Sequence, residues 1–117
     1  MKDLKLRTKE FALRIIRLHA ALPSTPVART LGNQLLRSGT SVGAHYREAC
    51  RARSTAEFVS KLGGGHQELE ETSYWLELLV ESKTLSAPQL GPLIQEADEL
   101  SAIFTTCTKN AKNGDSK

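Results

Sequence analysis

The segment STAEFVSKLGGGHQELEETSYWLELL, residues 54–79, decides the fold class of this chain. It opens with Ser54 and Glu57 at the spacing of a capping box, in which a hydroxyl and a carboxylate each satisfy a free backbone N–H. Spacings of four and three residues then alternate through Phe58, Leu62, Gly65, Leu69, Thr72, Leu76 and Leu79. That spacing places them on one stripe of a helix. The segment therefore predicts a long amphipathic helix.

Three further segments carry the same pattern. Residues 3–21, 24–52 and 86–109 each repeat apolar residues at spacings of three and four. Ser24-Thr25-Pro26 and Ser86-Ala87-Pro88 are typical helix starts, and Pro23 ends the first segment. Short links between long helices make neighbours antiparallel. We therefore expect an all-α protein, an antiparallel up-down-up-down four-helix bundle over residues 1–110, with a disordered tail at 111–117.

Two groups of glycines lie inside these predicted helices. Gly39 and Gly43 either weaken their helix or let a neighbour approach closely, and the unbroken apolar phase across them favours close packing. Gly63-Gly64-Gly65 costs a helix interior ~3 kcal/mol relative to alanines. A phosphate-cradling loop is one interpretation, but no strand precedes the glycines and no Gly-Lys-Ser/Thr follows them. We expect one helix here, kinked or loosened at the glycines.

The composition limits the class of protein. The 117 residues suit a single domain, and only 5% of them are aromatic, which favours a bundle over a β-sandwich. No apolar run approaches the ~20 residues that cross a bilayer, and the N-terminus lacks the apolar stretch of a signal peptide. We expect a soluble cytoplasmic protein with no membrane partner, in which Cys50 and Cys107 are reduced, buried thiols.

Charge is unevenly distributed along the chain. Residues 1–62 hold twelve Lys and Arg against four Asp and Glu, a net charge of +8, whereas residues 63–117 hold four against nine, a net charge of −5. Either the two halves neutralise each other, within the bundle or between subunits, or the basic half presents a face to a polyanion. The modest total of +3 favours neutralisation.

A cluster of cations around the second and third segments gives the candidates for contact with nucleic acid. These candidates are Arg37, Arg47, Arg51, Arg53 and Lys61. Arginine forks suit phosphate, and the ring of the neighbouring Tyr46 can stack on a base. In the alternative interpretation, Arg47 and Arg51 pair with Glu48 and with the acidic face of the third helix.

No constellation of residues points to catalysis, a cofactor or a metal. None of His19, His45 and His66 has a Glu three residues before it, so the Glu-x-x-His pairs of di-iron bundles are absent. His66 and Glu70 are four residues apart, but a metal needs three or four ligands. No serine lies in a Gly-x-Ser-x-Gly setting. We predict a protein that is not an enzyme, with no catalytic residue, no cofactor and no metal site.

The segment LRSGTSVGAHYREA, residues 36–49, resembles the signature of the four-helix-bundle proteins encoded in intervening sequences of 23S ribosomal RNA. The segments 51–54, 57–58, 68–71 and 74–79 fit the same pattern, and the resemblance covers roughly residues 3–108. It implies a homo-oligomer, a ring of five bundles, with no enzymatic activity. The family is also similar to the accessory proteins of diversity-generating retroelements, which are pentameric and basic and work with a reverse transcriptase and nucleic acid.

The chain departs from the family pattern at two places. His45 stands where the family usually carries Asn, and Gly63-Gly64-Gly65 replaces bulkier helix residues. The function that the resemblance implies is a pentameric bundle protein whose partners are itself, RNA or DNA, and a reverse transcriptase. The alternative is a protein-interaction scaffold whose basic and acidic faces pair between subunits.

Overall fold

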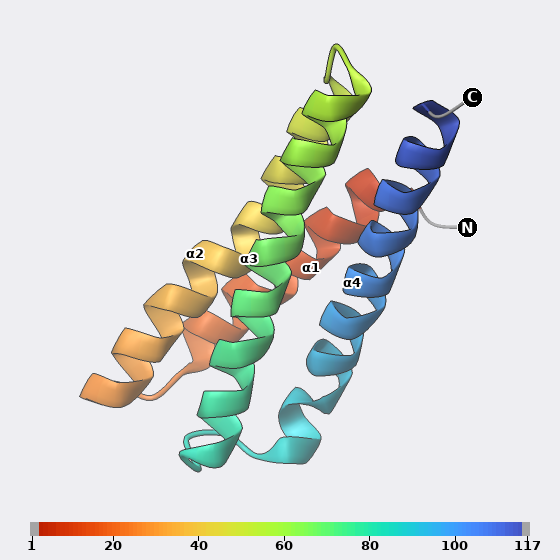
Figure 1. Ribbon diagram of the computed structural model, residues 1–117. Coiled ribbons are helices and arrows are strands. Elements are labelled where there is room, and N and C mark those ends of the chain that lie inside the picture. Colours follow the sequence, from red (N-terminus) through yellow and green to blue (C-terminus); the bar gives the residue numbers. More distant parts are fainter. Residues whose placement is uncertain (1–2, 116–117) are drawn as a thin grey trace.

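The computed structural model describes residues 3–115 and contains four α-helices joined by short turns. They are α1 (Leu4–Ala21), α2 (Pro26–Cys50), α3 (Thr55–Glu81) and α4 (Ala87–Asp115). α1 packs on α2, α2 on α3 and α3 on α4, and each helix runs antiparallel to the one before it (Figure 1). The bundle measures 52 × 21 × 21 Å. The predicted all-α, up-down-up-down four-helix bundle is confirmed.

Side-chain caps set the helix starts where the sequence predicted them. Thr25 Oγ1 accepts a hydrogen bond from the backbone N–H of Ala28 at 3.1 Å, and Ser54 Oγ accepts one from Glu57 at 3.0 Å. The second half of the predicted capping box differs. The carboxylate of Glu57 accepts from the backbone N–H of Arg53, at 3.3 Å, and not from Ser54. The glutamate thus reaches past the cap and ties the α2–α3 turn to the first turn of α3.

The predicted heptad stripes form the core. Leu35, Leu76 and Leu100, from three different helices, are all fully buried. Phe11 of α1 and Phe104 of α4 are the largest fully buried side chains. Complete burial of one such side chain stabilises the fold by about 1.5–3 kcal/mol. The common interior of the four stripes is therefore the main source of stability.

Gly39 and Gly43 let α1 lie directly against α2, as the close-packing interpretation predicted. A Cβ atom at Gly39 would lie 2.7 Å from Ile15 Cγ1, and one at Gly43 would lie 3.0 Å from Thr8 Oγ1. Ile15 and Thr8 are fully buried and have little room to move. The missing side chains on α2 are therefore a requirement of its contact with α1.

α3 continues as one helix through Gly63-Gly64-Gly65, as expected. The three glycines have different surroundings. A Cβ at Gly65 would lie 2.9 Å from Phe104 Cε2, and one at Gly64 would lie 2.9 Å from His45 Nδ1. A Cβ at Gly63 would meet nothing within 4 Å. Packing thus explains the second and third glycines and leaves the first without a steric reason inside the bundle.

α4 extends further than the sequence predicted. Residues 111–115 are helical, where a disordered tail was expected at 111–117, and residues 116–117 lie outside the described part of the chain. Ala111 and Lys112 are good helix formers, and a cation in the last turn suits the carbonyl end of the helix dipole. Within residues 3–115, no helix combines the length and the apolar character needed to span a bilayer.

We predict opposite effects of alanine at two helical glycines. Gly39→Ala gains about 1 kcal/mol of helix propensity but overpacks Ile15, at a typical cost of about 1–3 kcal/mol, so the free energy of unfolding should fall. Gly63→Ala meets open space and should raise the free energy of unfolding by about 1 kcal/mol. Urea denaturation followed by circular dichroism measures both. A Gly39→Ala variant as stable as the Gly63→Ala variant would contradict the packing argument.

Candidate nucleic-acid interface

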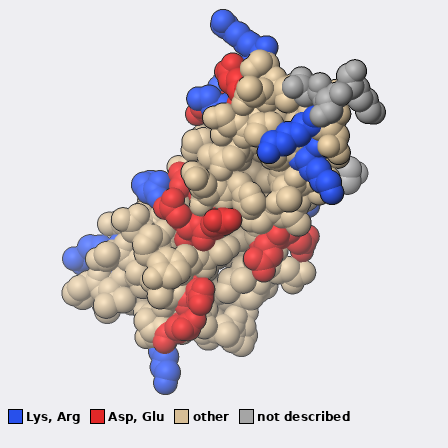
Figure 2. Space-filling view, in the orientation of Figure 1, with Lys and Arg blue, Asp and Glu red and all other residues tan. Residues whose placement is uncertain are grey.

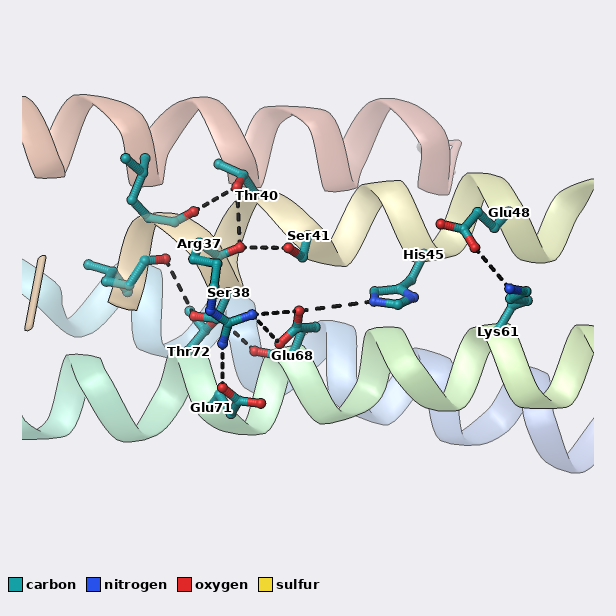
Figure 3. Close-up of polar contacts among 12 residues, drawn as sticks. Arg37, Ser38, Thr40, Ser41, His45, Glu48, Lys61, Glu68, Glu71 and Thr72 are labelled. Atoms are coloured by element: carbon teal, nitrogen blue, oxygen red, sulfur yellow. Dashed lines mark hydrogen bonds and ion pairs between the residues drawn. The ribbon is translucent and has the colours of Figure 1, made fainter. Parts of the chain in front are cut away.

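Arg37 lies in a polar seam between α2 and α3 (Figure 3). Its guanidinium donates to the Glu68 carboxylate, with Nη1 3.1 Å from Oε2, and to the Glu71 carboxylate, with Nη2 2.6 Å from Oε1. The side chain of Glu68 is only 12% exposed, so the pair is shielded from water on one side. Two carboxylates therefore neutralise Arg37. Two of its nitrogens are thus engaged within the bundle, although its side chain is 51% exposed.

His45 lies in the same seam and occupies the space that Gly64 leaves open. Its Nε2 lies 4.0 Å from Glu68 Oε2, and its Nδ1 is buried with no hydrogen-bond partner among the described residues. The Nδ1 edge faces the position where a side chain at Gly64 would begin. His45 and Gly64 are thus in direct contact: the imidazole fits because α3 has no side chain opposite it.

Lys61 is also engaged within the bundle. Its Nζ lies 3.2 Å from Glu48 Oε2, and both side chains are a little over 40% exposed. An ion pair with this much solvent contributes at most about 1 kcal/mol and is screened by salt. Lys61 is therefore available to a stronger anionic partner, although the pair lowers the local positive charge. Of the five predicted residues, Arg37 and Lys61 have carboxylate partners.

The other three predicted residues, Arg47, Arg51 and Arg53, form what we call the basic end. Arg47 lies in the last turn of α2, Arg51 caps that helix and Arg53 lies in the turn before α3. All three are exposed, and among the described residues none of their side chains has a carboxylate within ion-pair distance. Figure 2 shows cationic side chains at the tip of this end, with acidic side chains close to them and others over the middle and lower parts of the same face.

Tyr46 does not offer its ring to a nucleic-acid base. It packs against Phe104 of α4, with the ring centroids 5.9 Å apart, and its side chain is only partly exposed. Burial, followed by a hydrogen bond with the Cys50 side chain, raises the pKa of Tyr46 to about 12. The aromatic stacking suggested by the sequence is therefore not supported, because the ring fills the space between α2 and α4.

The cysteines differ from the prediction in their burial. Both are free, but Cys50 is exposed and Cys107 is partly exposed. Cys50 is the last residue of α2, and α1 does not extend this far: Thr8 lies against Gly43, so α1 begins about one turn beyond that point. Within the described chain, no Cα of α2 comes within 8 Å of a Cα of α4. A disulfide needs less than about 7 Å, so the two thiols are not placed to pair.

The sequence analysis did not include Lys109 and Lys112, which lie beside the first turns of α3. With His66 they line a hollow of about 410 Å³ between α3 and α4, at the same end of the molecule as the basic end. Their spacing of three residues, continued by Thr105 and Thr108 on the same side of α4, was the available signal. The signal was missed because Lys109 was expected at the end of its helix and Lys112 in a disordered tail.

Within residues 3–115, no three His, Cys, Asp or Glu side chains are grouped to hold a metal ion. His66 Nε2 lies 3.9 Å from Glu70 Oε1, a helical neighbour pair of which the carboxylate is largely exposed. The features described so far define a class: an all-α four-helix bundle with a polar seam at its centre and unpaired arginines at one end.

Comparison with known proteins places the chain within this class. A family model described as 23S rRNA-intervening sequence protein matches residues 3–106, and the chain belongs to this family. It is also similar to a crystal structure of a protein of unknown function from the S23 ribosomal protein family of Bacteroides thetaiotaomicron. The identity is 36%, the TM-score is 0.86, and the match covers 92% of this chain and 99% of the other. Neither description names an enzymatic activity. No curated protein gives a significant match.

The environment of Tyr46 predicts a titration. In a Tyr74→Phe variant Tyr46 is the only tyrosine, and its phenol should ionise near pH 12, against about 10 after unfolding in urea. Because the folded-state pKa is the higher one, the stability from this group is complete below pH 10 and is lost as the pH rises through 12. Near-ultraviolet absorbance of the phenolate gives the titration curve, and circular dichroism at each pH shows whether the helices persist. Ionisation of the folded protein near pH 10 would contradict the described packing of Tyr46.

Proposed function

We propose that this protein is a non-enzymatic, homo-oligomeric bundle protein that binds RNA or DNA through the basic end. The observation that carries the proposal is that Arg47, Arg51 and Arg53 are exposed and have no carboxylate partner among the described residues. Three guanidinium groups within seven residues, held by the end of one helix and the turn after it, give a rigid set of bidentate phosphate donors.

The expected binding is electrostatic and independent of sequence. The basic end offers no exposed aromatic ring, and its donors are forks that match phosphate oxygens. For a single strand, three phosphate contacts predict a slope of log Kobs against log salt of about −2 for each protomer. An oligomer multiplies the contacts on one strand and steepens the slope. Arg37 is outside this surface because Glu68 and Glu71 already neutralise it.

The prediction for this surface compares two double variants of equal charge. Arg51→Gln/Arg53→Gln should weaken binding of a fluorescein-labelled oligonucleotide roughly tenfold for each arginine and make the salt slope shallower by about 1.4. Arg29→Gln/Lys83→Gln removes two exposed cations at the opposite end and should leave affinity within about twofold after matching ionic strength. Arg37→Gln should likewise leave affinity unchanged, because this arginine is already paired. Fluorescence anisotropy across a salt series measures all of these.

Two results would count against the proposal. A wild-type protein that shows no binding at low salt removes it, and equal losses from the two double variants would reduce it to the effect of net charge. Dissociation of the oligomer by Arg51→Gln/Arg53→Gln would instead support the alternative, a scaffold in which basic and acidic faces pair between subunits.

The proposal of an oligomer rests on the outer face of α1. Leu6, Leu13 and Ile16 are 48%, 39% and 44% exposed and lie at helical spacing on one side of the helix, with the exposed Lys9 and Arg17 beside them. An apolar stripe with no cover inside its own bundle favours a contact with another protein surface. We propose that a second copy of the chain covers it.

The face proposed to cover this stripe is the outer side of α3, where Glu70, Tyr74, Glu77 and Glu81 follow one another at spacings of three and four. Tyr74 is 53% exposed, and a hydrogen bond with Glu81 raises the pKa of Glu77. Two carboxylates held this close suit a cationic partner surface. Among the described residues no Cα of α1 lies within 8 Å of a Cα of α3, so the outer faces of these two helices are different surfaces. Contact between two different faces is head-to-tail, which closes into a ring if the rotation allows.

The oligomer is tested by two single substitutions to glutamate at exposed apolar residues. Leu13→Glu places a charge in the α1 stripe and should convert the oligomer into a monomer of 12.8 kDa in light scattering after size exclusion. Val27→Glu, on a residue 52% exposed but outside the stripe, should leave the oligomer intact. A monomeric wild type would remove this part of the proposal, and loss of the oligomer in both variants would remove the assignment to α1.

A reverse transcriptase as a protein partner and a cytoplasmic location stay predictions drawn from the family resemblance and the sequence.

A further inference from the structure

A groove follows the seam between α3 and α4 on the side away from α2. It consists of two adjacent hollows of about 410 and 390 Å³, which share Val59 and Lys112. The first contains Gly63, His66 and Lys109, and the second contains Ser60 and the first turn of α3. Because the lining residues of α3 run from residue 55 to residue 66, the groove is about 16 Å long.

The lining of the groove is largely apolar, and the polar groups that it does carry suit an anion. Its walls carry the ammonium groups of Lys109 and Lys112, the imidazole of His66 and several hydroxyls, and no carboxylate is among the lining residues of either hollow. The nearest described acidic contact is that of His66 with Glu70, at 3.9 Å, on a side chain that is 73% exposed. Lys112 makes a further contact of its own, so the argument rests on Lys109.

The groove gives a reason for the glycine at position 63, which packing in the core of the bundle does not explain. Gly63 lines the first hollow, and a Cβ there would meet nothing within 4 Å. A longer side chain at this position would project into the hollow instead of the core. Thr55, which lines the second hollow, is two residues after Arg53, so the groove lies at the same end of the molecule as the basic end.

We propose that the α3–α4 groove holds the phosphodiester backbone of a single nucleic-acid strand that continues from the basic end. The inference rests on the proposed function and extends it by naming the form of nucleic acid and its path. No Phe, Tyr or Trp side chain lines either hollow, and the lysines favour contact with phosphates over contact with bases. A hollow of about 400 Å³ fits a nucleotide-sized group.

Two variants test the groove by different physical means. Lys109→Gln removes a charge, with Lys83→Gln at the other end as its control. Gly63→Gln fills the hollow without changing charge, and its control is Gly91→Gln, since Gly91 is also helical and open to solvent. The ligand is a fluorescein-labelled oligouridylate of about twelve nucleotides, titrated against the full chain at several salt concentrations. Circular dichroism confirms that each variant is folded.

Both groove variants should weaken binding about tenfold, while the two controls stay within about twofold. Lys109→Gln should also make the salt slope shallower by about 0.7, and Gly63→Gln should leave the slope nearly unchanged. If Arg51→Gln/Arg53→Gln weakens binding but the groove variants do not, the groove inference fails and the proposed function stands. If the wild type does not bind the oligonucleotide, both fail. Because inorganic polyphosphate shares the chemistry of linked phosphates, it is tested as a separate ligand. Groove variants that lose polyphosphate binding alone would overturn the assignment to nucleic acid.

Discussion

The antiparallel contact between α2 and α3 is the interaction on which the rest of the structure depends. The contact buries leucines of the heptad stripes. It also buries a hydrogen bond between two side-chain hydroxyls, in which Thr72 Oγ1 lies 2.9 Å from Ser38 Oγ. α1 rests on α2 through the glycines of that helix, and α4 rests on α3. The contact between α1 and α4 is slight and includes the charged hydrogen bonds of Arg7 with Glu96 at 2.7 and 2.8 Å. The α2–α3 hairpin is therefore the platform that positions both outer helices.

The packing of the α2–α3 hairpin also determines which cations in the basic half of the chain have a carboxylate partner. Where the two helices lie side by side, cations of one helix meet carboxylates of the other, as with Arg37 and Glu68 or Lys61 and Glu48. Arg47, Arg51 and Arg53, at the end of the hairpin, are exposed and have no such partner among the described residues. Ion pairing between the two helices thus extends along the hairpin as far as Lys61 and Glu48, and these three arginines form the exposed basic surface at that end. The two sequence interpretations apply to different parts of one molecule.

The sequence was sufficient for the architecture because helix starts and heptads are local properties. The caps Thr25 and Ser54 and the stripe through Leu35 and Leu76 act within one or two turns and required no knowledge of neighbours. The site was harder, because partners of a surface charge come from another helix. Nothing in the order of residues distinguishes Arg37 from Arg51, and only the packing shows that Tyr46 faces Phe104. Lys112 was missed because the length of α4 was underestimated, and Lys109 because only the packing shows that it lies beside α3.

The contact between His45 and Gly64 has a consequence for how this chain can change over evolutionary time. Any side chain larger than hydrogen at position 64 would begin 2.9 Å from the imidazole, so it requires the ring to move away or to be replaced. A smaller residue in place of His45, with Gly64 retained, leaves a gap beside Glu68. The two positions are therefore epistatic: each tolerates substitution best when the other changes with it, and lineages should carry them as a matched pair.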